Sequence, residues 1–560
     1  MATSRGSGAA APSSAERLGL GLLLAAAGGV RWLAWERSAT LFNDGPHFLA
    51  IARAMHAGAW AAALRAEYHP LFPLATLAAH AALPDWETAA AAVSIASGIA
   101  AVLFLFLWLR DAFGAAPAWA GSVLLAAHSR AIEYSSDVQS DGLYTALFLA
   151  ALWLGWRALR GRSALLAAAS GAVAALAYLV RPEGLELLVA LGACAARELL
   201  RGPWISDSSR RWAAPAAARW LAALAAGAAL LVVPYVVALR QQTGAWTLTP
   251  KRSVSAVMSA GAPRAAPAPP AEQQAPAPVW ATYLTTPSVA AIDPSALVID
   301  ESEDGEAVIV ARTPATRAYA AAKMLARTAK SSMRYGVLAL VLLGALVSRG
   351  RPGPRARFLA VLLCVHLGLL YAFTLGIGYV SRRHTLPALL PLLGYAGLGA
   401  LAAGGWIERR MRSLGAEAAP ARVPAGLAAT LVVALVAGGE LTTQIEPRRA
   451  EERAGRRAAE WLRDNAPAPG PVATTRLRLG YYAGMPYVPL GGVGEAALGE
   501  YLTRAGARYA VVDDAGRAAA LQRMPDLDAR PLWRVEASGS QAWVFELGPP
   551  RAGREARVEH

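Results

Sequence analysis

The chain has 560 residues, of which 55% are hydrophobic, and its 54 Lys and Arg against 39 Asp and Glu give a formal net charge of +15. The apolar residues form long blocks, which excludes an ordinary soluble protein, and most of the Arg lies between those blocks, which argues against a nucleic-acid surface. Cys194 and Cys364 lie inside apolar blocks, and the sequence has no Cys/His metal motif, P-loop or dinucleotide motif. Neither a disulfide framework nor a nucleotide site is therefore expected.

About eleven apolar blocks are candidates for membrane spans, since a spanning helix needs about 20 mainly apolar residues. The blocks are 17–36, 88–109, 116–130, 141–159, 163–180, 184–200, 213–239, 335–348, 356–379, 385–405 and 424–441. The first block resembles a signal peptide, but its apolar stretch continues through Arg31 to Trp35 without a convincing cleavage site. We interpret it as an uncleaved first span. The expected fold is a polytopic α-helical membrane protein.

Four short loops between these blocks are rich in arginine. They contain Arg157, Arg160 and Arg162; Arg197, Arg201, Arg210 and Arg211; Arg349, Arg351, Arg355 and Arg357; and Arg409, Arg410 and Arg412. All four loops fall on the cytoplasmic side if the N-terminus is cytoplasmic, as the positive-inside rule requires. Eleven spans in the inner membrane then place the C-terminus on the extracytoplasmic side.

Two long segments are expected on the outer face, at 37–87 and 241–334. In the first, Phe48, Ile51, Ala52 and Met55 recur at helical spacing, which predicts a helix lying flat in the membrane interface. The second contains APRAAPAPPAEQQAPAPV, which is typical of a flexible loop. It continues through an acidic patch at 300–306 into a basic helical run.

The remaining segment, 442–560, is expected to be a soluble domain outside the membrane, separate from the transmembrane domain 1–441. EPRRAEERAGRRAAEWLRDNAP predicts a polar helix, PVATT, AGARYAVVDD and QAWVFELG predict strands, and EAALGEYLTRAG predicts a helix between two of them. Strands that alternate with helices indicate a small α/β domain.

Acidic residues at the outer ends of spans are candidates for catalysis, because ionisable groups at membrane depth or at its edge are costly and each is a functional hypothesis by default. Asp44, in LFNDGPHF, follows the first span and is suited to accept a proton from an attacking hydroxyl. Since Asp before Gly-Pro is also a helix-capping signal, capping is the alternative for Asp44. Asp141 precedes a later span, with Asp137 and Glu133 nearby, and it too has the capping alternative.

Cationic residues on the same side are candidates for binding a phosphate. Arg181, and the run Arg382, Arg383 and His384, lie on the side where orientation signals are not expected. A guanidinium pairs two phosphate oxygens at once; the alternative is snorkelling to lipid headgroups. His69 is either a phosphate or acceptor contact or an ordinary interfacial histidine.

The order of these motifs resembles the C-type glycosyltransferases of the protein O-mannosyltransferase and lipid A aminoarabinose transferase group. The resemblance covers about 20–405: an acid after span one, a helix, then Tyr68-His69-Pro70-Leu71, followed by SDGLYTALFL, LAYLVRPEGL and SRRHTLPALLPLL. Two features depart from the family pattern. Gly45 follows Asp44 where the family has a second acid, and Leu71 stands where the family has a second proline.

The resemblance implies an inverting glycosyltransferase that moves a sugar from a polyprenyl-phosphate carrier in the bilayer to a hydroxyl acceptor on the outer face. Asp44 would be the base, with Asp141 as the second acid, and Arg181, Arg382, Arg383 and His384 would bind the donor phosphate. His47, His69, Glu133 and Asp137 would contact the acceptor or donor. No nucleic acid is implied. The acceptor class, whether protein, glycolipid or wall polymer, and the need for a divalent metal stay open.

Two other classes of function fit parts of the sequence. A transporter or flippase of lipid-linked sugars would explain the apolar spans, but no duplicated half is visible. A structural or sensory membrane protein would explain the soluble tail, but not the charges at the membrane edge.

Overall fold

The structure is a computed structural model that describes residues 13–207, 210–250, 278–284, 313–350, 353–413, 426–444, 446–490, 495–524 and 527–548. Its contacts divide the chain into two units. The helical unit consists of Met1–Glu36, Ala91–Leu248 and Glu303–Glu446, and the loop–sheet unit consists of Arg37–Ala90, Thr249–Ser302 and Pro447–His560. The expected flexible loop up to residue 277 and the acidic patch at 300–306 lie outside the described residues.

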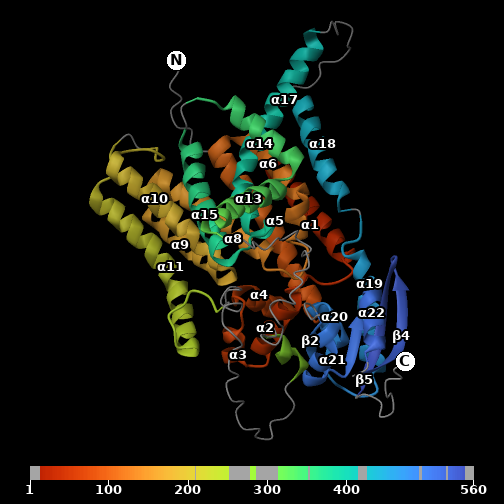
Figure 1. Cartoon of the computed structure of the whole chain (residues 1–560). Coiled ribbons are helices and arrows are strands. Elements are labelled where there is room, and N and C mark those ends of the chain that lie inside the picture. The colour runs from red at the N-terminus through yellow and green to blue at the C-terminus, as the bar shows by residue number, and fades with distance from the viewer. Residues whose placement is uncertain are drawn as a thin grey trace. The chain divides into compact units, whose positions relative to one another are not determined.

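Helices make up the described part of the helical unit (Figure 1). They are α1 (Ser14–Glu36), α5 (Trp86–Phe113) from Ala91 onward, α6 (Ala115–Ala127), α7 (Ser129–Glu133), α8 (Asp141–Gly161), α9 (Ala164–Val180), α10 (Glu186–Arg201), α11 (Ala214–Thr243), α13 (Pro314–Met333), α14 (Tyr335–Val347), α15 (Pro354–Ile377), α16 (Arg382–Leu389), α17 (Leu393–Ser413) and α18 (Leu427–Thr442), with 3-10 turns η1 (Pro182–Leu185) and η5 (Leu390–Leu392).

Each predicted span coincides with a helix, and the expected polytopic helical fold is confirmed. Among the described residues, six helices are long and apolar enough to cross a membrane, and a seventh span results if α13 and α14, which meet at 97°, count as one broken span. Other predicted spans correspond to shorter apolar helices such as α6, α9 and α18. The number eleven therefore stays a prediction.

Close packing of α9 against α11 depends on two glycines. A Cβ atom on Gly171 would lie 2.1 Å from the Leu224 carbonyl oxygen, and one on Gly227 would lie 2.0 Å from that of Ala168. Only a residue without a side chain allows the two backbones to approach so closely. Small residues at helix contacts are the usual device of membrane helices, because apolar lipid supplies no hydrophobic force to press helices together.

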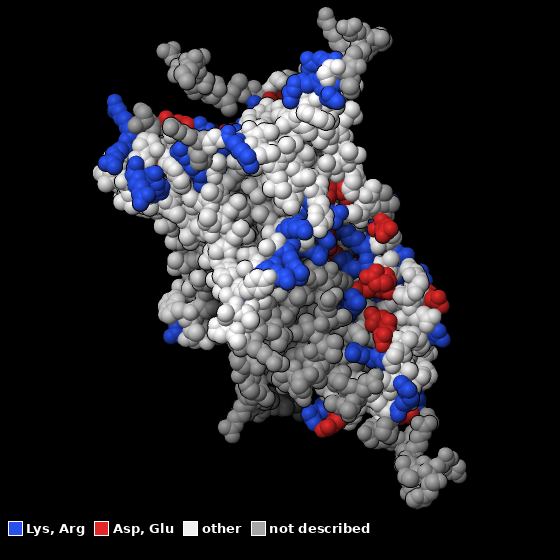
Figure 2. Space-filling model, turned by 45° about the horizontal axis from the view of Figure 1, so that its top comes forward, with Lys and Arg blue, Asp and Glu red and all other residues white. Residues whose placement is uncertain are grey.

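Three of the four arginine-rich loops meet at one end of the helices. The Arg160 guanidinium pairs with Asp207, Arg357 donates to the Trp204 carbonyl at 2.9 Å, and Arg162 donates to the Arg210 carbonyl at 2.8 Å. On the face shown in Figure 2, Lys and Arg gather in separate groups and leave a broad uncharged surface between them. This arrangement agrees with the grouping that the positive-inside rule predicted for these loops.

The loop–sheet unit combines short helices with a five-stranded sheet in the order β2-β1-β3-β5-β4. Strand β1 pairs with β2 and β3 in parallel, whereas β5 pairs with β3 and β4 antiparallel. The elements are α2 (Gly45–His56), α3 (Trp60–Arg65), α4 (Leu71–His80), η2 (Val279–Tyr283), η7 (Ala450–Glu452), α19 (Arg453–Asn465), β1 (Val472–Thr474), α20 (Leu477–Ala483), β2 (Tyr487–Pro489), α21 (Glu495–Arg504), β3 (Tyr509–Val512), α22 (Ala515–Arg523), β4 (Asp528–Ala537) and β5 (Ser540–Gly548).

The expected sheet domain at the C-terminus is confirmed. Strands β1, β3 and β5 and helices α19 and α21 lie where the sequence predicts them, whereas β2, β4, α20 and α22 were not predicted. The core of this domain lies between the sheet and the helices α21 and α22, where Leu498, Leu521, Val512 and Phe545 are buried together. The structure groups this domain with the segment after the first span.

The predicted interfacial helix is present as α2, but its apolar side is covered by protein. Ile51 and Met55 are buried in a cluster that includes Tyr283 and Leu284, and Phe48 contacts the ring of Phe72. The sequence could not show this cover, because η2 is more than two hundred residues away along the chain.

Candidate active site

Asp44 occupies the N-cap position of α2, but its side chain makes no capping hydrogen bond. The Asp44 carboxylate accepts a hydrogen bond of 3.0 Å from the Tyr68 hydroxyl. Pro46 in the first turn has no N–H to be capped, which reduces the need for a capping side chain there. The carboxylate is therefore oriented by a tyrosine and is not used to cap α2.

A histidine packs against the tyrosine that contacts this carboxylate. The His47 ring stacks on Tyr68, with 5.3 Å between ring centroids. The His47 Nδ1 donates to the Tyr283 carbonyl at 2.6 Å, because a carbonyl oxygen can only accept. In the neutral ring, Nε2 then carries the lone pair. His47 and Tyr68 therefore lie close to Asp44. His69, which follows Tyr68 in the chain, is also buried.

The short segment that leads from α1 to Asp44 is held by the C-terminal domain. The Arg456 guanidinium donates to the Ala39 carbonyl at 2.9 Å, and the Leu41 N–H donates to the Tyr482 hydroxyl at 2.9 Å. The Thr40 hydroxyl donates to the Glu452 carboxylate at 2.7 Å. These contacts fix the backbone just before the candidate base.

Glu452 is the centre of this attachment. Its carboxylate is 1% exposed and pairs with the guanidinium groups of Arg476 and Arg478. Arg478 is fully buried and also donates to the Leu41 carbonyl at 3.1 Å. The positive charges and the carboxylate thus compensate one another inside the protein, as buried charges require.

In the helical unit, the candidate phosphate residues are centred on Arg181. Its guanidinium pairs with Asp141, at the first turn of α8, and with Glu183 at 3.2 Å. Burial would raise the pKa of the Glu183 carboxyl, but the charge of Arg181 and its hydrogen bond to Glu183 outweigh burial and hold that pKa well below its usual range. Asp141 and Glu183 together fix the orientation of Arg181.

The run after α15 contributes to the same cluster. The backbone N–H of Ser381 donates to His384 Nδ1 at 3.1 Å, so Nε2 carries the ring proton, and Nε2 lies 3.8 Å from Glu183. Arg383 is near enough for its charge to act on Arg181. The Arg382 Nε instead donates to the Ser331 hydroxyl on α13 at 3.2 Å. The two arginines of the doublet therefore have different surroundings.

Two further candidates in the helical unit have local partners. The Glu133 carboxylate pairs with Arg130 at 2.7 Å, and Asp137, which is fully buried, accepts from the Val138 N–H at 2.7 Å. Within the described part of the chain, the side-chain amide of Gln139 and the hydroxyl of Tyr144 are buried without a hydrogen-bond partner. Tyr144 lies under the Arg181 guanidinium, 5.7 Å from it. These polar atoms are available to a ligand.

Sequence reasoning missed three residues that complete these groups. Glu183 stands in the quoted Arg-Pro-Glu-Gly segment, and Tyr68 in the quoted Tyr-His-Pro-Leu segment, so both were within reach. Tyr283 carries no local signal, because only the fold brings its carbonyl to His47. Within the described ranges, no group of three or more His, Cys, Asp or Glu is arranged to hold a metal ion.

Comparison with known proteins identifies solved structures with a similar fold. No protein-family model matches the sequence, and no characterised protein matches it at the sequence level. Two crystal structures of ArnT from Cupriavidus metallidurans match along 95% of this chain and 98% of theirs, each with a TM-score of 0.53. One is the apo state, at 15% identity, and the other is bound to undecaprenyl phosphate, at 14% identity. The fold expected from the resemblance to C-type glycosyltransferases is confirmed.

Proposed function

We propose that this multi-pass membrane protein is an inverting glycosyltransferase. It takes its sugar from a polyprenyl-phosphate carrier and transfers it to a hydroxyl acceptor on the extracytoplasmic face. The observation that carries the proposal is the carboxylate of Asp44: it follows the first span, is oriented by Tyr68, and is not used to cap α2. The similar fold of ArnT, which has been seen with undecaprenyl phosphate, supports a lipid-phosphate donor.

The proposed reaction is a single displacement. The acceptor hydroxyl oxygen attacks the anomeric carbon from the face opposite the phosphate, while Asp44 takes the hydroxyl proton. The bond between the anomeric carbon and the phosphate oxygen breaks, and its electron pair leaves with the lipid phosphate. The transition state has oxocarbenium character, as in glycoside hydrolysis. General-base catalysis of this kind contributes about 10²–10⁴-fold to the rate.

The negative charge that grows on the leaving phosphate requires fixed cations. Arg181 is preoriented by Asp141 and Glu183, and Arg383 lies near enough for its charge to act on Arg181. Groups fixed before the reaction stabilise developing charge best, because they need not reorganise. We assign donor-phosphate binding to Arg181 and Arg383, with His384 Nε2–H and the Tyr144 hydroxyl as neutral donors.

A transporter of lipid-linked sugar is the second candidate, favoured by the break between α13 and α14. Arg334 joins the two helices with a positive φ of 58°, and its Nε donates to the Glu440 carboxylate at 3.2 Å. Discontinuous helices form the substrate sites of many transporters. Transport would move the lipid-linked sugar across the bilayer without cleaving its bond to phosphate.

One assay separates the two functions. Purified protein in liposomes is given a panel of radiolabelled polyprenyl-phosphate sugars and a mixture of protein, glycolipid and wall-polymer acceptors. The transferase proposal predicts label on an acceptor together with free polyprenyl phosphate. Intact donor that changes leaflet without cleavage would contradict it and support transport.

A further inference from the structure

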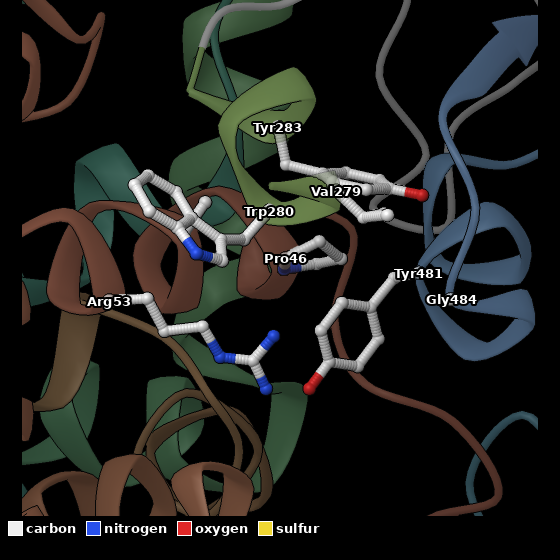
Figure 3. A pocket seen from close by; sticks show the side chains of 8 residues that line it. Pro46, Arg53, Val279, Trp280, Tyr283, Tyr481 and Gly484 are labelled. Atoms are coloured by element: carbon white, nitrogen blue, oxygen red, sulfur yellow. The ribbon is translucent and has the colours of Figure 1, made fainter. Parts of the chain in front are cut away.

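The loop–sheet unit contains a pocket of about 150 Å³ beside the helix that Asp44 begins. Its walls come from three segments far apart in the sequence: Pro46, Ala50 and Arg53 of α2, Val279, Trp280 and Tyr283 of η2, and Tyr481 and Gly484 at the end of α20 (Figure 3). Pockets for drug-sized ligands usually have volumes of roughly 300–1,000 Å³. The smaller volume of this pocket suits an occupant of about one ring.

The pocket is held in shape by buried hydrogen bonds. Tyr283 is 2% exposed, its hydroxyl donates to the Met485 carbonyl at 2.6 Å, and its own carbonyl accepts from His47. These bonds attach η2 to the segment that follows α20 on one side and to α2 on the other. A preformed pocket binds its ligand with less loss of conformational entropy than a pocket that must be assembled.

The chemistry of the lining is aromatic with a single charge. Trp280, Tyr283 and Tyr481 present ring faces and edges, and Arg53 is the one charged side chain among the lining residues. Aromatic rings pack well against the C–H faces of sugars, and cations are attracted to ring faces. The Arg53 guanidinium lies 5.8 Å from the ring centroids of both Trp86 and Tyr481.

The Arg53 guanidinium forms no ion pair or hydrogen bond with any residue in the described part of the chain, so its planar fork can pair with an anion. Figure 3 shows the guanidinium and the Tyr481 hydroxyl pointing toward each other across the pocket. That hydroxyl is hydrogen-bonded to Glu87, and burial raises the pKa of Tyr481 well above its usual range, so it stays protonated. Because it donates to Glu87, its oxygen is left to accept a hydrogen bond from a sugar hydroxyl.

We infer that this pocket binds one sugar unit of the acceptor, and that this unit carries a negatively charged group, either a carboxylate or a phosphate. The ring packs on Trp280 and Tyr481, and the anion pairs with Arg53. The inference rests on the proposed transferase function and names the acceptor as an anionic glycan. Pro46 belongs to the first turn of the helix that Asp44 begins, so the bound unit lies in the same unit as the proposed base.

The first test measures direct binding to the full chain in nanodiscs by ligand-observed NMR. The probes are a methyl glucuronoside, glucose 6-phosphate, neutral methyl glucoside and N-acetylglutamate. The inference predicts binding of at least one anionic sugar, about tenfold or more tighter than methyl glucoside, and the preferred probe identifies carboxylate or phosphate as the anion. Equal binding of charged and neutral sugars, equal binding of N-acetylglutamate, or no binding of the sugars would overturn it.

Two matched pairs of variants locate the binding. Arg53→Gln should weaken binding of the anionic sugar about tenfold to a hundredfold, as expected for loss of a charge-assisted pair. Arg65→Gln, on the neighbouring helix α3, should leave binding unchanged. Trp280→Ala should weaken binding of charged and neutral sugars alike, whereas Trp60→Ala, at an exposed tryptophan of the same unit, should not. Equal effects within either pair would overturn the assignment.

A kinetic readout separates this inference from the proposed function. In the transfer assay, Arg53→Gln should raise the acceptor KM and leave donor binding unchanged, and Arg53→Lys should restore part of the loss because it keeps charge without the fork. Normal acceptor KM in a folded, active Arg53→Gln variant would overturn the pocket assignment while the transferase proposal stands. Absence of any transfer by the wild type would contradict the proposed function itself.

Discussion

Replacing Glu452 by alanine should destabilise the loop–sheet unit strongly, because the change leaves buried cations without their counter-charge. Glu452 is 1% exposed and Arg478 is fully buried, and the same carboxylate accepts from the Thr40 hydroxyl. Removing one partner of a buried ion pair costs about 3–5 kcal/mol. Since net stabilities of folded domains are about 5–15 kcal/mol, the loss would be a large share of the total.

The assay is thermal unfolding of the purified chain in detergent, followed by circular dichroism and by tryptophan fluorescence. Glu452→Ala should lower the unfolding midpoint by several degrees, and Glu452→Gln, which keeps an oxygen to accept from Thr40, should lower it less. The matched control is Glu500→Gln, in an exposed i,i+4 pair with Arg504, where the loss should be about 0.5 kcal/mol or less.

A second readout separates positioning from mere stability. At a temperature where Glu452→Gln is fully folded, transfer should still fall, because Glu452 holds the segment that leads to Asp44. Equal midpoints for Glu452→Ala and the Glu500→Gln control, or full activity of both Glu452 variants, would refute the reasoning. The C-terminal domain would then be a separate module without a part in positioning the base.

Three further predictions concern the helical unit and its orientation. Arg383→Lys should reduce transfer more than Arg382→Lys, because Arg383 acts on the Arg181 cluster and Arg382 donates to α13; equal turnover of both variants and the wild type would make the doublet an interfacial anchor. The Arg181–Glu183 pair should persist to pH 5. The pKa of Glu183 is lowered in the folded protein, so the stability that the pair contributes is complete above the pKa of the carboxyl in the unfolded chain. That stability is lost only as the pH falls through the lowered folded-state pKa. The difference in unfolding midpoint between wild type and Glu183→Gln should therefore match at pH 7 and pH 5, and a smaller difference at pH 5 would contradict the pairing. Alkaline phosphatase fused after His560 should be active and green fluorescent protein fused there should be dark, and the reverse would contradict the proposed orientation.

Local patterns in the sequence were enough to predict most of the helical architecture. Apolar blocks coincide with α1, α5, α8 and α15, because the length and composition of a spanning helix are set by the bilayer itself. The segments PVATT, AGARYAVVDD and QAWVFELG also predicted β1, β3 and β5. Strand β2 has only the three residues Tyr487–Pro489, too few for a periodic signal.

The candidate site was predictable only in its separate parts. Asp44, Asp141, Arg181 and His384 are marked by their positions at the ends of apolar blocks, where charge is otherwise avoided. Which of these residues pair is decided by packing between helices, as with Arg181 and Asp141. A local sequence pattern does not contain that information.

The pocket was not predictable at all. Arg53 reads as an ordinary cation in the last turn of an amphipathic helix, and Trp280 follows a stretch that looks like a flexible linker. They become partners only because Tyr283 anchors η2 between α2 and the segment after α20 through two buried hydrogen bonds. Contacts over such sequence distances depend on the completed fold.

Turnover of Asp44→Asn, compared with Asp85→Asn in the same liposome assay, tests the central claim most directly. Asp85 does cap a helix, since its carboxylate accepts from the Thr88 N–H at 2.7 Å, and asparagine caps a helix about as well as aspartate. Asparagine cannot take a proton from a hydroxyl, so Asp44→Asn should lose at least about a hundredfold in transfer rate, while it still binds donor and stays folded. Asp85→Asn should keep wild-type turnover. A folded Asp44→Asn variant with near-normal transfer would contradict the account, and Asp141 would then be the first carboxylate to test as the base.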